Sequence, residues 1–149
     1  MRAAKLLIIM AAIPIICQAY SGQPGSTGLG IIIGEPTGIS FKVWNSRKTA
    51  FDAGIAWSFG KNGRLHLHGD YLVHNYNAFS NRQLPLYAGA GARAKFGDDT
   101  RLGVRGVIGI NYLFRELPLD AFVEIVPVFD LVPETSFGLN AGIGMRFFF

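Results

Sequence analysis

The chain has little of several things that a soluble domain usually contains. It carries one cysteine, Cys17, and only 16% of its residues are charged, whereas a soluble domain has about 25%. Half of the residues are apolar, yet no long apolar run occurs after the start of the chain. Glycine is abundant, at 19 residues, without a collagen-like period. This composition favours a protein whose outer surface faces lipid.

The start of the chain predicts a signal peptide over residues 1–19. A positively charged beginning is followed by the apolar stretch Leu6–Ile16, which is shorter than the roughly 20 residues of a spanning helix. Small residues at Cys17 and Ala19 place cleavage after Ala19. Two alternatives stay open: an uncleaved anchor, and lipid attachment at Cys17, which the bulky Ile16 before it disfavours.

Cleavage would remove the one cysteine together with Arg2 and Lys5. The mature chain would then hold no thiol for a disulfide or a thiolate metal site. Its formal charge would fall from +4 to +2, because two cations are lost. So small a charge, without a long basic run, argues against nucleic acid as a partner. We expect no cofactor.

The mature chain is predicted to form a leader over residues 20–28 and a barrel over residues 29–149. Eight segments of the barrel alternate in polarity with the period of two that is typical of strands. Turn residues separate the segments. The predicted strands are Leu29–Ile33, Ile39–Asn45, Ala50–Phe59, Arg64–Tyr76, Leu84–Phe96, Arg101–Phe114, Asp120–Leu131 and Phe137–Phe149.

Most segments have one row of bulky apolar residues and one row of small or polar residues. The interior of an eight-stranded barrel is only just wide enough for side chains, so bulky rows from every strand would overfill it. We therefore expect the bulky rows to face lipid and the other rows to face inward. Backbone groups in lipid must all be paired. The pattern thus predicts an all-β, closed, antiparallel up-and-down transmembrane barrel, with a soluble calycin-like barrel as the alternative.

The last segment ends in Gly144-Met145-Arg146-Phe147-Phe148-Phe149 and resembles the C-terminal signal of outer-membrane barrels. In that class the barrel-assembly machinery recognises the last strand, so the resemblance implies an assembly signal at Ile143, Met145, Phe147 and Phe149. In size and pattern the chain resembles small OmpA/OmpX-type barrels of Gram-negative bacteria. This implies a monomer in the cell outer membrane that contacts outer-membrane lipid, with both termini in the periplasm.

Two further segments, Gly30–Gly38 and Leu117–Glu124, resemble a narrower family of uncharacterised small outer-membrane barrel proteins. That family has no established function. The resemblance therefore implies the fold and the location alone.

Charged residues on inward positions predict an interior ion-pair network, because unpaired ions in so narrow a space would be strongly destabilising. We expect Glu124 to lie near Arg105 or Arg146, and the network to plug and rigidify the barrel. A proton or ion path is the alternative. The predicted network comprises Lys42, Asp70, Arg93, Arg105, Glu124 and Arg146; Asp52, Lys95, Asp120 and Asp130 also fall on inward positions.

His66, His68, Asp70 and His74 share one face of a single predicted strand. A His-x-His pair can bind a transition metal, with Asp70 as a third ligand. No second cluster in the sequence completes such a site. We therefore expect interior polar groups and no bound metal, and keep these four residues as metal candidates.

One enzyme class shares a partial motif with this chain. His74-Asn75-Tyr76-Asn77-Ala78 resembles the His-x-Ser-Asn-Ala motif that lipid A-modifying acyl hydrolases carry on a lipid-facing strand. Tyr76 occupies the serine position, so the nucleophilic hydroxyl is missing. We expect a structural or surface-interaction protein without catalysis. The alternatives are a hydrolase-like barrel and a barrel that transports lipids or small solutes.

Overall fold

The computed structural model describes residues 20–34, 37–58 and 63–149. The predicted signal peptide and its cleavage site lie outside these residues. Among the described residues, no helix has the length and apolar character needed to cross a membrane.

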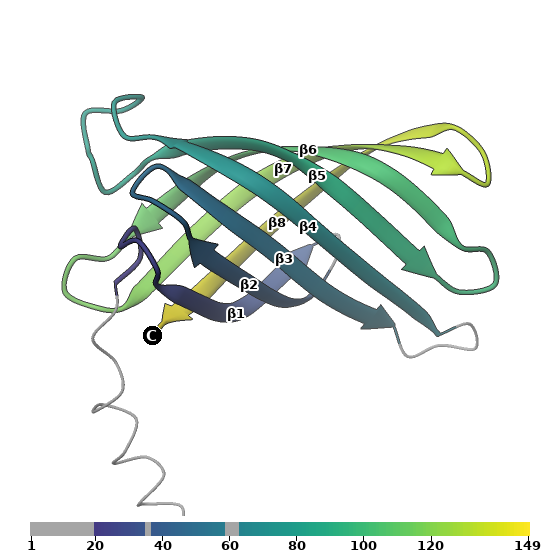
Figure 1. Ribbon diagram of the computed structural model, residues 1–149, viewed down its shortest axis with the longest axis horizontal. Helices are drawn as coiled ribbons and strands as arrows, with labels where there is room; N and C mark the ends of the chain where they lie inside the picture. Colours follow the sequence, from purple (N-terminus) through teal and green to yellow (C-terminus); the bar gives the residue numbers. More distant parts are fainter. Residues whose placement is uncertain (1–19, 35–36, 59–62) are drawn as a thin grey trace, which may run out of the picture.

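The described residues form eight antiparallel strands that close into a barrel (Figure 1). Each strand pairs with its neighbour in sequence, and the last strand pairs with the first. The predicted fold class, a closed antiparallel barrel of eight strands, is confirmed. The strands are β1 (Thr27–Gly34), β2 (Gly38–Trp44), β3 (Thr49–Ser58), β4 (Arg64–Asn75), β5 (Leu86–Phe96), β6 (Arg101–Leu113), β7 (Leu119–Val132) and β8 (Ser136–Phe148).

The predicted boundaries agree with the observed ones to within two residues, and one difference has a structural cause. β1 begins at Thr27, so the last two residues of the predicted leader belong to the barrel. Thr27 exchanges backbone hydrogen bonds with Phe149, at 3.1 and 2.9 Å, and Gly28 is opposite Phe148. The pairing that closes the barrel therefore extends into the leader.

The two ends of the barrel differ in their connections (Figure 1). We call one the terminus end: it carries Tyr20–Ser26, the connections 45–48, 76–85 and 114–118, and Phe149. The opposite end, called the loop end, carries the connections 97–100 and 133–135. The longest connection, between β4 and β5, lies at the terminus end.

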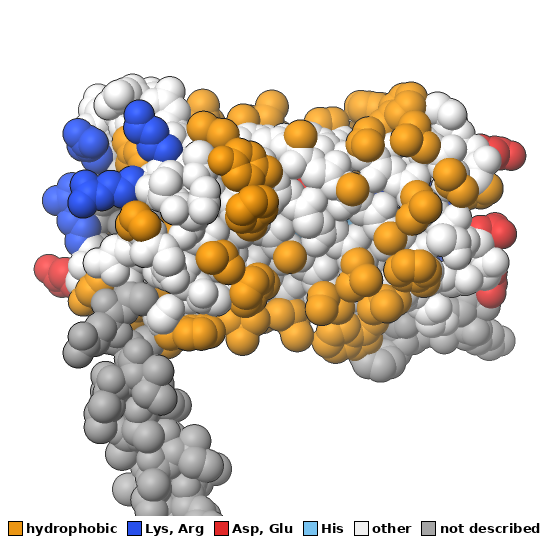
Figure 2. Space-filling model, viewed as in Figure 1, with side chains coloured by type: hydrophobic (Ala, Val, Ile, Leu, Met, Phe, Trp, Pro, Cys, Tyr) orange, Lys and Arg blue, Asp and Glu red, His pale blue; other side chains and the backbone are white. Residues whose placement is uncertain are grey.

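The bulky apolar rows form the outer surface of the barrel, as the alternation predicts. Exposed apolar side chains occur on every strand, among them Ile31, Phe51, Ile108 and Ile143. Ile108, in the middle of β6, is 57% exposed. Figure 2 shows these side chains distributed along the length of the barrel wall, with charged side chains confined to the two ends.

Several large aromatic residues point inward and help to fill the interior. Trp44, Tyr87, Phe122 and Phe148 are all buried. Cross-strand glycines make room for three of them: Tyr87 is opposite Gly109, Phe122 opposite Gly144 and Phe148 opposite Gly28. At these three glycines, the volume that a side chain would fill is therefore occupied by the aromatic ring of the facing strand.

Gly109 offers a direct test of this packing. A Cβ atom at Gly109 would lie 2.5 Å from the Tyr87 hydroxyl oxygen and 2.7 Å from the Val123 carbonyl oxygen. We expect Gly109→Ala to lower the free energy of unfolding by about 1–3 kcal/mol, because the ring must move. Equilibrium unfolding in detergent micelles would measure this.

Gly138→Ala is the matched control, because a Cβ atom at Gly138 would meet no atom within 4 Å. We expect its unfolding free energy to stay within about 0.5 kcal/mol of wild type. Equal losses in the two variants would contradict this account of the interior.

Candidate functional site

The charged side chains of the interior gather into separate ion-pair clusters, and the first is centred on Arg146 of β8. Its guanidinium contacts Asp52 through Nη1 at 2.7 Å and Asp120 through Nε at 3.0 Å. The ring of Phe122 lies 4.0 Å from the guanidinium carbon, a cation–π contact. Asn111 also donates to Asp120, at 3.0 Å. One cation thus joins β3, β7 and β8 across the interior.

The second cluster is centred on Arg105 of β6. Its Nε atom lies 2.9 Å from an Asp70 carboxylate oxygen, and its Nη2 atom lies 3.9 Å from Glu124. The Tyr87 hydroxyl donates to the other Glu124 oxygen at 2.7 Å. Of the two partners that the sequence left open for Glu124, the ion pair in the structure is with Arg105.

Arg93 and Asp130 form the third pair, nearer the loop end. Two parallel hydrogen bonds join them, from Nε at 3.0 Å and from Nη2 at 2.6 Å. This two-pronged geometry is the strongest form of an arginine–carboxylate contact. Asp130, together with Asp52 and Asp120, supplies partners that the predicted network did not name.

Lys42 differs from the other residues of the predicted network. No carboxylate in the described part of the chain forms an ion pair with it. Its Nζ atom lies 2.9 Å from His74 Nε2 and 4.3 Å from the centre of the Trp44 ring. The Lys42 ammonium is therefore held by an imidazole and an aromatic face, and not by an acidic partner.

The four metal candidates do not converge on one point. His66 and His68 lie ring to ring, with centroids 5.7 Å apart, whereas His74 contacts Lys42 and the Lys48 carbonyl oxygen. Among the described residues, the group with metal-compatible spacing is Asp52, His68 and Asp70, whose ligand atoms lie within 4.8 Å of one another.

This Asp52–His68–Asp70 group is better explained by ion pairing. Arg146 contacts Asp52, and Arg105 contacts Asp70. A cation entering the group would have to compete with the two guanidinium groups that already form ion pairs with these carboxylates. The sequence pattern did not show that Asp52 is a neighbour of Asp70. The two residues lie on different strands, β3 and β4, and are opposite each other only through the strand register.

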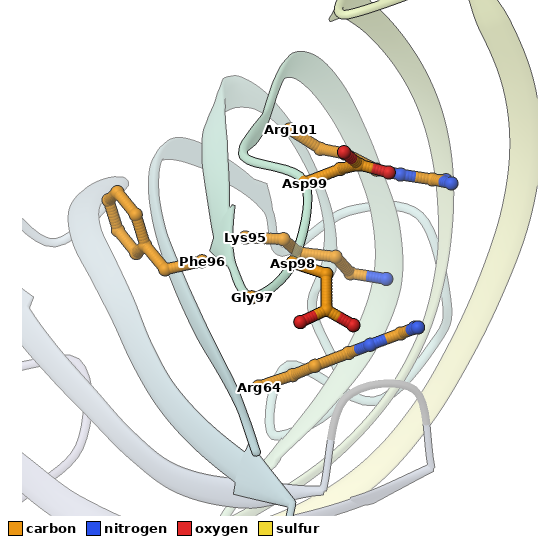
Figure 3. Close-up of a pocket in the computed structure, with 7 residues that line it drawn as sticks. All are labelled: Arg64, Lys95, Phe96, Gly97, Asp98, Asp99 and Arg101. Atoms are coloured by element: carbon orange, nitrogen blue, oxygen red, sulfur yellow. The ribbon is translucent and has the colours of Figure 1, made fainter. Parts of the chain in front are cut away.

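A small pocket of about 130 Å³ opens at the loop end, where β5 turns into β6 (Figure 3). The side chains of Arg64, Lys95 and Arg101 extend to the same side of the ribbon, whereas Phe96 points the opposite way. Asp98 and Asp99 line the same pocket. Cations and carboxylates are thus mixed at this end of the barrel.

The four residues of the predicted assembly signal lie on one row of β8. Ile143, Met145, Phe147 and Phe149 are all exposed on the outer face. Ile143, Met145 and Phe147 are each opposite a β1 residue, so the row borders the closure of the barrel.

The partial hydrolase motif lies in a different setting from the lipid-facing strand of that class. His74 is buried inside the barrel. The Tyr76 hydroxyl donates to the Arg47 carbonyl oxygen. Neither the buried His74 nor the hydrogen-bonded Tyr76 supplies a nucleophile for ester cleavage.

No protein-family model and no curated protein matches the sequence. A solved structure does match: the N-terminal β-barrel domain of Pseudomonas aeruginosa OprF, at 16% identity and a TM-score of 0.65. The match covers 85% of this chain and 98% of that domain. At this identity the likeness concerns the fold. The chain thus shares the fold of that barrel domain.

Arg146 provides the test of the interior network. Arg146→Met would leave Asp52 and Asp120 buried without their cation, so we expect a loss of about 3–5 kcal/mol in the free energy of unfolding. Unfolding in detergent micelles would measure the loss. Arg101→Gln, at an exposed position outside the network, should change it by less than about 0.5 kcal/mol. Similar values for the two variants would rule out a stabilising role for the network.

Proposed function

We propose that this chain is an exported outer-membrane β-barrel protein of structural or surface-interaction type. The observation that carries the proposal is the distribution of polarity in the barrel. Apolar side chains cover the wall, and arginines and carboxylates pair inside. A barrel in water would expose polar groups and bury the apolar rows. A closed barrel in lipid requires the observed arrangement.

The filled interior supports a role without solute conduction. Trp44, Tyr87 and Phe148 lie inside, and the ion pairs of Arg105 and Arg146 cross between strands. An eight-stranded barrel has little room beyond such side chains. We propose that these contacts plug and rigidify the wall, and that the protein acts through its surfaces.

The setting of His74 supports a protein without catalysis. Its ring contacts Lys42 and a backbone oxygen inside the barrel, away from the face where a lipid substrate would bind. The export signal over residues 1–19, the monomeric state and the narrower family of uncharacterised small outer-membrane barrels remain parts of the same proposal.

Charge substitutions at two depths test whether the wall lies in a membrane. Ile108 is at mid-strand, and Phe137, which is 70% exposed, is at the start of β8 near the loop end. A lysine on the lipid face lowers the free energy of unfolding by about 2–4 kcal/mol at the bilayer midplane and by about 0–1 kcal/mol near the interface. We therefore expect Ile108→Lys to destabilise the barrel in lipid vesicles far more than Phe137→Lys. Equal small effects would indicate a wall exposed to water.

Phe149 tests the predicted assembly signal. Its backbone pairs with Thr27, whereas its side chain is on the outer face. Phe149→Ala keeps the backbone pairing, so we expect purified protein to fold in detergent as wild type does. In cells, the amount recovered in the outer-membrane fraction should fall severalfold. Recovery of the variant at the wild-type level would show that Phe149 is not part of the assembly signal.

A further inference from the structure

The terminus end of the barrel holds a pocket of about 430 Å³ that differs in charge from the pocket at the loop end. Its walls come from four separate parts of the chain: the segment before β1, the β2–β3 turn, the β4–β5 connection and Leu113 at the end of β6. Three cations line it, Arg47, Lys48 and Arg82, and no described carboxylate does. Figure 2 shows Lys and Arg side chains gathered at this end.

The turn that carries Arg47 and Lys48 is fixed by its neighbours. The Ser46 side chain accepts backbone hydrogen bonds from Lys48 and Thr49. The Lys48 carbonyl oxygen accepts a bond from the His74 backbone at 2.7 Å, and the Arg47 carbonyl oxygen accepts one from the Tyr76 hydroxyl. Burial raises the pKa of the Tyr76 hydroxyl, which therefore keeps the proton that it donates.

Arg82, in the β4–β5 connection, lines the same pocket. The next residue, Gln83, bonds to Leu113 of β6 through its backbone oxygen at 2.8 Å and its side-chain nitrogen at 3.1 Å. Gly22 also lines the pocket and lies close to two other lining residues. A Cβ atom added at Gly22 would be 3.3 Å from Leu113 and 3.5 Å from Tyr76. The three cations are thus presented around one cavity by anchored backbone.

Apolar side chains are exposed on the outer face at the same end of the barrel as this basic pocket. Phe51 and Val73 are exposed near the same ends of β3 and β4, and Phe79 is exposed in the β4–β5 connection. A ligand with a phosphate group and hydrocarbon chains could thus place the phosphate among the cations and the chains along the wall. Basic residues beside a membrane attract anionic headgroups in this way.

We propose that Arg47, Lys48 and Arg82 bind the phosphate group of an anionic phospholipid in the leaflet at the terminus end. This site rests on the proposed membrane function. The loop-end pocket offers no comparable site, because Asp98 and Asp99 line it together with its cations.

The test uses the isotope-labelled barrel in amine-oxide micelles, which contain no phosphate, titrated with phosphatidylglycerol. The lipid should shift the amide signals of Arg47, Lys48 and Arg82 in a saturable manner. The triple variant R47Q/K48Q/R82Q should bind about tenfold more weakly or worse, because it loses three cations. The variant R64Q/K95Q/R101Q removes the same charge at the loop end and should bind as wild type does.

Two further titrations identify the ligand chemistry. Diacylglycerol, which lacks the phosphate, should leave these signals unchanged, and equal shifts with it would overturn the proposal. Inorganic phosphate at equal concentration should bind far more weakly, and equal binding would overturn the lipid as the source of the phosphate. A saturable shift that is lost equally in both triple variants would also overturn the site.

The same sample separates this proposal from the membrane function. Folding in micelles, seen as faster migration of the unheated protein on a gel, tests the barrel itself. A folded barrel that shows no shift with phosphatidylglycerol refutes the lipid site alone. A chain that fails to fold in both micelles and vesicles refutes the membrane barrel.

Discussion

The width of the interior is the constraint on which the rest of this structure depends. Eight strands enclose a space that side chains alone can fill, so every inward residue must fit against those on facing and neighbouring strands. Tyr87 fits because Gly109 is opposite it, and Phe148 fits because Gly28 is opposite it. Charged residues obey the same constraint, since a buried ion must find its partner within this space. Glycine content and charge pairing are therefore two results of one geometry.

The outer surface follows from the interior. Once the lumen is full, the second row of each strand has nowhere to point except outward, and that row is apolar. The charges that remain exposed lie at the two ends (Figure 2). There they differ: cations and no described carboxylate line the pocket at the terminus end, whereas the pocket at the loop end is lined by both signs. The barrel therefore has a uniform apolar wall between two ends that differ in charge.

Strand number, boundaries and facing could be predicted from the sequence because each depends on residues close together in the chain. Alternation with a period of two separates the faces of a strand, and turn residues mark its ends. The prediction was wrong for Thr27 and Gly28, which the sequence placed in the leader. Their strand character comes from pairing with Phe149 and Phe148 at the far end of the chain, which local pattern does not contain.

The sequence by itself determined that Arg105, Arg146, Glu124 and the histidines would share the interior. Successive side chains of a strand point to opposite faces, so the facing of each residue depends only on its position along its own strand. Only the tertiary structure decided which of them meet. Register across strands brings Asp52 opposite Asp70 and Arg146 opposite Asp120, whereas closure of the barrel brings Arg146 to Asp52 and leaves Lys42 with His74. The basic pocket depends on tertiary structure in the same way, because its three cations come from two connections that β3 and β4 separate. Contacts between distant segments are fixed by closure of the barrel, and closure is a property of all eight strands together.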